Sequence, residues 1–220
     1  MSACCGHDHG TFDGTSPGFR RALWIVIVIN AGMFLVEMTA GSLSQSQALK
    51  ADALDFLADS LTYGISLMVL GKSLRVRATA ALLKGSSLLL MGLWVFGSTL
   101  YRVLVPGIPD APVMGIVGVM ALLANVASVL ILMRYKDGDA NVRSVWLCSR
   151  NDAIGNVAVL VAAGAVTFVG HGWPDLLVAT MMAGLFLWSS IQIIRQAQGE
   201  WRLDPARGQE GEIFMDSTVK

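Results

Sequence analysis

The sequence predicts an all-α protein that crosses a membrane with six helices. Hydrophobic residues make up 54% of its 220 residues and charged residues only 15%, whereas soluble domains average about 25% charged residues. The mean hydropathy is +0.60. Six apolar segments are each long enough to cross the core of a bilayer, which takes about 20 helical residues. A polytopic membrane protein is therefore the expected fold class.

Short polar connections separate these six segments. The expected helices cover residues 22–42, 48–72, 78–103, 112–134, 143–170 and 174–195. Pro and Gly are concentrated at 106–112 and 170–175, which marks both stretches as turns between antiparallel helices. Residues 1–18 are expected to form a flexible cytoplasmic tail and residues 19–197 the six-helix domain. Residues 198–220 are too few to bury a core and are expected to form a second short tail.

The basic residues predict how the helices are oriented. Most of those near the ends of the expected helices fall on one side of the membrane: Arg20, Arg21, Lys72, Arg75, Arg77, Arg134, Lys136, Arg143, Arg195 and Arg202. The other side has only Lys50 and Arg102 near its helix ends. Because Lys and Arg are enriched in cytoplasmic loops, we expect both termini in the cytoplasm and the chain in the plasma (inner) membrane.

Composition excludes several other classes of protein. The net charge is zero and the isoelectric point is about 6.8, so binding of nucleic acid through a basic face is not expected. Three cysteines, an odd number with no secreted spacing, argue against a disulfide framework. The first 18 residues lack the basic-then-apolar order of a signal peptide.

The second apolar segment carries an acidic stripe. Asp52, Asp55 and Asp59 are spaced i, i+3 and i+7, so a helix places them on one face. A carboxylate at bilayer depth costs roughly 3 kcal/mol, so the three require a partner, a proton or a cation. The alternative is the solvated face of a surface helix, which the apolar surroundings disfavour.

The fifth segment carries a second polar stripe. Cys148, Asp152 and Asn156 recur every four residues and lie on one helical face. For this stripe to lie in the membrane, the helix must begin by about Val142. Arg150 then points away from the stripe, and no role is assigned to it.

Two helices that each offer ligands four residues apart can converge on one tetrahedral centre. The candidate ligands are Asp55 and Asp59 from one helix and Cys148 and Asp152 from the other. Carboxylate oxygen with thiolate sulfur suits zinc or cadmium, whereas magnesium and calcium prefer oxygen alone. In the alternatives, Cys148 is a small buried apolar residue and the aspartates bind only protons, or the residues form an unrelated substrate site.

Other polar residues in the membrane segments have two interpretations. Asn30 and Glu37 share a face of the first segment. Glu37, Asp52 and Asn156 either carry protons or pack by hydrogen bonding to neighbouring helices.

The N-terminal stretch combines thiols and imidazoles within six residues. Its candidate ligands are Cys4, Cys5, His7 and His9. This cluster either captures cytosolic metal for delivery to the membrane site or binds metal adventitiously in a flexible tail.

These motifs resemble those of the cation diffusion facilitator family of metal/proton antiporters, over about residues 22–196. The stretch Asn30-Ala-Gly-Met-Phe-Leu-Val-Glu37 resembles the first helix of the family, and Ala48-Leu-Lys-Ala-Asp-Ala-Leu-Asp-Phe-Leu-Ala-Asp59 resembles its second-helix motif. Cys148-Ser-Arg-Asn-Asp152 stands where the family has His-x-x-x-Asp. The resemblance implies a transport site of Asp55, Asp59, Cys148 and Asp152. It also implies export of divalent metal against proton entry by a homodimer, with no bound cofactor.

The sequence departs from the family in three places. Cys148 replaces the usual His, residues 198–220 are too short for the cytoplasmic C-terminal domain, and the loop at 136–143 contains no His. We therefore expect a member without that domain, with zinc or cadmium as cargo and with cobalt, iron and manganese left open. Ala81, Gly85 and Gly92 offer a close-packing face on the third helix.

The transport site would be overcharged if every ligand were ionised. Three carboxylates and one thiolate leave two excess negative charges around a divalent cation, which is costly in a buried site. We therefore expect some of the four groups to stay protonated until metal arrives and expels their protons.

Two other functions use similar acidic stripes. A proton-coupled exporter of small organic cations is the main alternative. Membrane enzymes that transfer lipid head groups also use acidic pairs at this spacing, but the sequence lacks their upstream Asp-Gly-x-x-Ala-Arg motif, so no enzyme is expected. A purely structural protein would have no use for buried aspartates on two helices.

Overall fold

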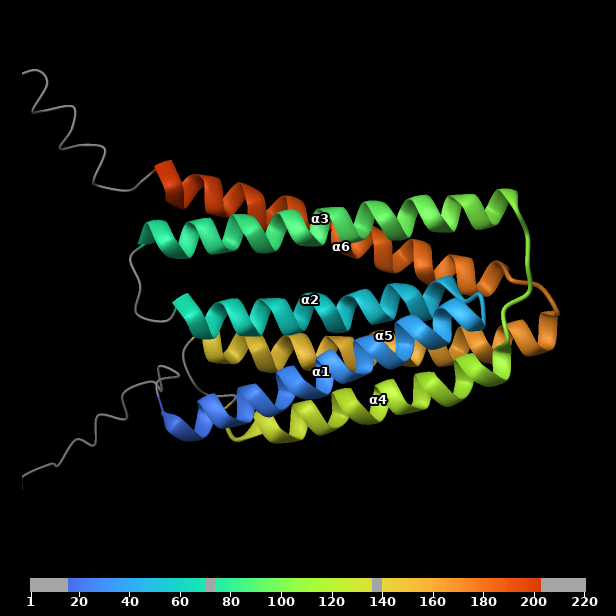
Figure 1. Cartoon of the computed structure of the whole chain (residues 1–220), viewed down its shortest axis with the longest axis horizontal. Helices are drawn as coiled ribbons and strands as arrows, with labels where there is room; N and C mark the ends of the chain where they lie inside the picture. The colour runs from blue at the N-terminus through green and yellow to red at the C-terminus, as the bar shows by residue number, and fades with distance from the viewer. Residues whose placement is uncertain (1–15, 70–73, 136–139, 203–220) are drawn as a thin grey trace, which may run out of the picture.

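A computed structural model describes the backbone of residues 16–69, 74–135 and 140–202, without the side chains of residues 74, 140–151 and 200–202. The described residues form six α-helices and no strand (Figure 1). The helices are α1 (Pro17–Leu43), α2 (Gln47–Val69), α3 (Leu74–Leu104), α4 (Ala111–Met133), α5 (Ala140–Val169) and α6 (Trp173–Arg202). The all-α, six-helix prediction is confirmed.

The helix ends differ from the expected ones by a few residues, for identifiable reasons. Helix α1 begins at Pro17 because the Ser16 Oγ accepts a hydrogen bond from the Phe19 N–H at 3.2 Å and Pro suits the first helical turn. The last two residues of the expected N-terminal tail are therefore helical. Helix α6 continues to Arg202, past the expected end of the domain. Helix α5 begins at Ala140, as the stripe of its polar residues requires.

Five of the described helices are long and apolar enough to cross a membrane, namely α1, α3, α4, α5 and α6. Helix α2 is 23 residues long, but it is not among these five because it carries Lys50 and three aspartates within its length. It packs against α1, α3, α5 and α6. These neighbours shield its polar stripe from lipid, which explains how a helix with three aspartates sits inside the bundle.

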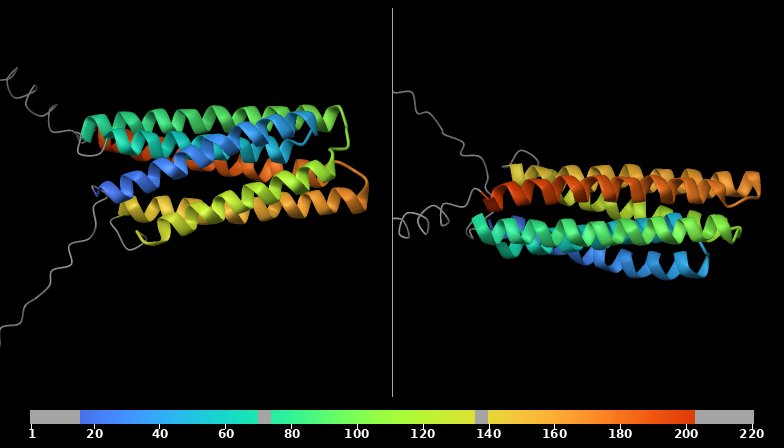
Figure 2. Two further views of the ribbon diagram at one scale, coloured as in Figure 1. Left: turned by 60° about the horizontal axis from the view of Figure 1, so that its bottom comes forward. Right: turned by 90° about the horizontal axis from the view of Figure 1, so that it is seen from above.

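The helices run along one another, and α3 packs chiefly against α6 (Figures 1 and 2). The connections at 44–46, 105–110 and 170–172 lie at one end, which we call the loop end (Figure 1). Helix α1 begins and α6 ends at the opposite end, the terminal end. Which end faces the cytoplasm stays a prediction.

Small residues bring α3 and α6 into close contact. A Cβ atom on Gly85 would lie 2.7 Å from Cγ1 of Ile194, and one on Gly92 would lie 3.1 Å from Cγ of Leu187. The close-packing face predicted on the third helix is thus used by α6 of the same chain.

Candidate metal site

Three of the predicted ligands lie together between α2 and α5. The carboxyl group of Asp152 on α5 interacts with the carboxyl groups of Asp55 and Asp59 on α2. All three side chains are half-buried. We call these residues the carboxylate trio. Among the described residues, no three His, Cys, Asp or Glu side chains form a ready-made metal-binding group, so coordination by the trio stays a prediction.

The remaining predicted ligands lie outside the described side chains. The backbone of Cys148 is helical and lies one turn before Asp152 in α5, but its side chain and that of Arg150 are outside the described part. The N-terminal cluster of Cys4, Cys5, His7 and His9 is outside it as well.

Two neutral side chains hold Asp59 in place. The Tyr63 hydroxyl donates a hydrogen bond to Oδ2 of Asp59, and the Asn30 Nδ2 donates to the same oxygen at 3.5 Å. Tyr63 is fully buried, with 0% of its surface exposed. Because both donors use Oδ2, they fix the orientation of the carboxylate. Tyr63 was not among the candidates from the sequence, although it lies one turn after Asp59 on the same helical face.

We expect Tyr63→Phe to raise the KM for zinc by about 10-fold with little change in kcat, because a lost hydrogen bond to a charged group costs about 1.5–3 kcal/mol. Metal-dependent flux into proteoliposomes measures both constants. The matched control is Tyr101→Phe, since Tyr101 is exposed on α3. Equal KM values in the two variants would contradict the role given to Tyr63.

Asp52 does not join the trio but belongs to a separate buried network. The Asn125 Nδ2 on α4 donates to Oδ1 of Asn156 on α5 at 2.7 Å. The Asn156 Nδ2 in turn donates to Oδ2 of Asp52 at 2.7 Å. All three side chains are at most 3% exposed. Within the acidic stripe of α2, Asp52 therefore belongs to the buried network, whereas Asp55 and Asp59 lie with Asp152.

Glu37 extends this network to a fourth helix, α1. Its side chain is 0% exposed and interacts with Asp52. Neither of its carboxyl oxygens has a well-formed hydrogen bond within the described part of the chain. A buried acidic group without donors is costly when ionised, so the pair of Glu37 and Asp52 is a suitable place to hold a proton.

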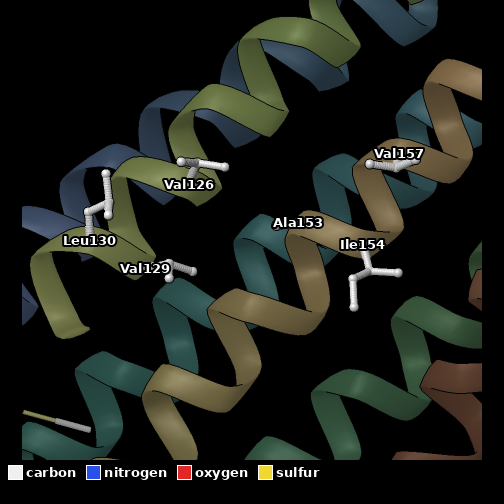
Figure 3. Close-up of a pocket in the computed structure, with 6 residues that line it drawn as sticks. All are labelled: Val126, Val129, Leu130, Ala153, Ile154 and Val157. Atoms are coloured by element: carbon white, nitrogen blue, oxygen red, sulfur yellow. The ribbon is translucent and has the colours of Figure 1, made fainter.

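A pocket of about 480 Å³ lies between α4 and α5 (Figure 3). Its lining is entirely apolar and consists of Val126, Val129, Leu130, Ala153, Ile154 and Val157. It offers no ligand to an ion, and none of the predicted metal ligands lines it.

Comparisons with known proteins place the chain in a family. The family model described as the cation efflux transmembrane domain matches residues 23–198. The chain is 26% identical over 208 residues to the "Cadmium, cobalt and zinc/H(+)-K(+) antiporter" of Bacillus subtilis (strain 168), covering 87% of this chain and 65% of that protein. It is 25% identical to the "Metal cation efflux system protein CzcD" of Cupriavidus metallidurans, covering 83% of this chain and 60% of that protein.

The name of a third relative mentions zinc alone. The chain is 25% identical over 207 residues to the "Zinc transporter ZitB" of Escherichia coli (strain K12), covering 88% of this chain and 66% of that protein. The chain thus spans between 60% and 66% of the length of these three relatives.

Proposed function

Because this chain belongs to the cation efflux family, we propose that it exports divalent transition-metal cations, zinc or cadmium first, in exchange for protons. The observation that carries the proposal is the convergence of Asp55, Asp59 and Asp152 from α2 and α5. The names of the relatives include zinc, cadmium and cobalt, and this chain offers oxygen ligands and a nearby cysteine that suit such cations.

The proposed mechanism uses the trio and Cys148 as a single cargo site. Metal enters from the cytoplasm, which we place at the terminal end, and displaces protons from the ligands. The helices then rearrange, and protons from the opposite side replace the metal. We further propose that the protein works as a homodimer in the plasma membrane and has no enzymatic activity. A capture role for Cys4, Cys5, His7 and His9 stays a prediction.

The proposal is tested by metal flux into proteoliposomes under an imposed pH gradient. Zinc and cadmium are compared with magnesium, which the site does not suit, and with a small organic cation. Zinc or cadmium flux that requires the gradient supports the proposal. Well-folded protein that moves only the organic cation would overturn it in favour of the alternative function.

Cys148 tests the thiolate part of the site. We expect Cys148→Ser to weaken cadmium transport more than zinc transport, by about 10-fold in KM, because cadmium is the softer ion and prefers sulfur. The measurement is the ratio of the cadmium and zinc KM values under the same gradient. The control is Ser42→Ala, because the exposed Ser42 hydroxyl bonds to the Met38 carbonyl oxygen of its own helix. An unchanged ratio in Cys148→Ser would show that the thiol is not a ligand.

We also propose that Glu37 and Asp52 hold a proton that takes part in coupling. The two side chains interact with each other and are at most 1% exposed, which supports this role. We expect Glu37→Gln to keep zinc binding but to reduce the number of protons released for each zinc ion bound. Calorimetry in buffers of different ionisation enthalpy measures that number. Asp110→Asn, which neutralises an exposed carboxyl group at the loop end, is the control. Equal proton release in Glu37→Gln and the native protein would leave Glu37 with a packing role.

A further inference from the structure

An aspartate on α6 caps a different helix, α2. Asp175 lies in the first turn of α6 and is 1% exposed. The Ser46 Oγ donates to its Oδ1 at 2.6 Å. The Gln47 N–H donates to its Oδ2 at 2.8 Å, and the Ala48 N–H donates to its Oδ1 at 3.0 Å. Every one of these donors belongs to the beginning of α2. We call this set of three hydrogen bonds the Asp175 clamp.

The Asp175 clamp provides hydrogen-bond acceptors for backbone N–H groups in the first turn of α2. The first N–H groups of any helix have no partner within the helix. Here Ser46 serves one of them, since its Oγ accepts from the Leu49 N–H at 3.1 Å, and Asp175 serves two others. Gln47, Ala48 and Leu49 are buried, so water does not replace Asp175. The α2 helix therefore depends on α6 for its N-terminal hydrogen bonds.

The clamp lies where the three connections at the loop end contact one another. The Asp110 N–H donates to the Ser44 carbonyl oxygen at 3.0 Å, and the Arg102 guanidinium donates to Oε1 of Gln45 at 2.8 Å. A Cβ atom on Gly172 would collide with the carbonyl oxygen of Gly107. The connections between α1 and α2, α3 and α4, and α5 and α6 are thus interlocked.

Burial along α2 changes from one end of the helix to the other. Residues 47–54, at the loop end, are buried except for Lys50. Most of residues 57–69, toward the terminal end, are at least partly exposed, and Tyr63 is the exception. The two aspartates that α2 contributes to the trio lie where these two halves meet. Helix α2 is therefore enclosed by its neighbours between the trio and the loop end, and less so toward the terminal end.

We propose that Asp175 is a positioning residue that keeps the loop end closed by tying α6 to the beginning of α2. Release of the cargo toward the loop end then requires the Asp175 clamp to open. Helix α6 packs chiefly on α3, so opening the clamp frees that pair to move against the helix that carries Asp55 and Asp59. This inference rests on the proposed transport function.

The test compares Asp175→Asn with the native full-length protein in lipid nanodiscs and in proteoliposomes. Asparagine keeps the size of the side chain but places an NH₂ group against donors. The matched control is Asp110→Asn, because Asp110 lies at the same end and is exposed, and its side chain accepts only from its own helix, from the Val113 N–H at 3.2 Å. Amide hydrogen exchange reports opening of the loop end, and zinc flux under a pH gradient reports turnover.

We expect Asp175→Asn to raise amide exchange by about 10-fold or more in residues 44–50, 105–112 and 170–175, with no change in residues 57–69. We expect kcat for zinc to fall by about 10-fold, because the loop end must close again after each release and the variant closes less readily. We expect KM to stay within about 3-fold, because the cargo ligands are untouched. A cap with only a structural role would raise exchange in the first turn of α2 alone and leave kcat unchanged, and that result would overturn the inference.

Two further outcomes are decisive. If Asp175→Asn does not fold, Ser46→Ala removes one hydrogen bond of the clamp together with the acceptor of the Leu49 N–H. It must then give smaller changes in the same direction in residues 105–112 and 170–175 and in kcat, and no change in these would overturn the inference. If the native protein moves no zinc, the proposed function fails. In that case, a rise in amide exchange of Asp175→Asn that is confined to the first turn of α2 would separately contradict the role proposed for the clamp.

Discussion

Replacing Asp152 with alanine is expected to abolish zinc flux, lowering kcat/KM by about 100-fold or more, which corresponds to about 3 kcal/mol of lost binding free energy. Asp152 is the member of the trio that comes from α5, and it lies against both Asp55 and Asp59. After its removal, the two remaining carboxylates of the trio, those of Asp55 and Asp59, both lie on α2. Flux of zinc into proteoliposomes under a pH gradient measures the loss.

The design separates loss of a ligand from loss of the fold. Asp110→Ala removes an exposed aspartate that caps only its own helix and should keep native flux. Asp59→Ala should behave like Asp152→Ala, because we propose that the two side chains serve one cargo site. Flux near the native rate in well-folded Asp152→Ala would refute the two-helix site.

Replacing Asn156 with valine is expected to destabilise the protein by about 3 kcal/mol, because the change leaves one buried donor and one buried charged acceptor unpaired. The donor is the Asn125 Nδ2 and the acceptor is Oδ2 of Asp52. Reversible unfolding in mixed detergent micelles, followed by circular dichroism, measures the free energy of unfolding.

A comparable change outside the network provides the control. Thr180→Val replaces an exposed hydroxyl that bonds only to the Leu176 carbonyl of its own helix, and it should change stability by less than about 0.5 kcal/mol. Equal stabilities for Asn156→Val and Thr180→Val would mean that the network does not hold the four helices together.

The sequence predicted the six helices because their length and apolar composition are local properties of the chain. It also predicted a shared site of Asp55, Asp59, Cys148 and Asp152, in which four-residue spacing places each pair on one face of its own helix. The convergence of the two helices came from chemical reasoning about ligands and from the resemblance, and the structure brings these three carboxyl groups together.

Partners that depend on packing between helices could not be predicted in this way. Spacing groups Asp52 with Asp55 and Asp59, but its hydrogen bond goes to Asn156, and this partner depends on how α2 and α5 are rotated about their axes. By sequence Asp175 is an ordinary first-turn residue of the last helix, whereas its carboxylate caps α2. Neither hydrogen bond can be predicted from the local pattern of the sequence, because each joins two different helices.

The polarity of α2 has a consequence for biogenesis. Three aspartates would each cost roughly 3 kcal/mol on entering lipid alone, so α2 cannot leave the translocon as an independent segment. Helix α1 precedes it by a connection of three residues and packs along it, and these two helices can be inserted together as a hairpin. The partners of these aspartates on α5, Asn156 and Asp152, are synthesised later. The acidic stripe is therefore fully shielded only after α5 has been inserted. We expect quality-control proteases to recognise nascent chains that are truncated before α5.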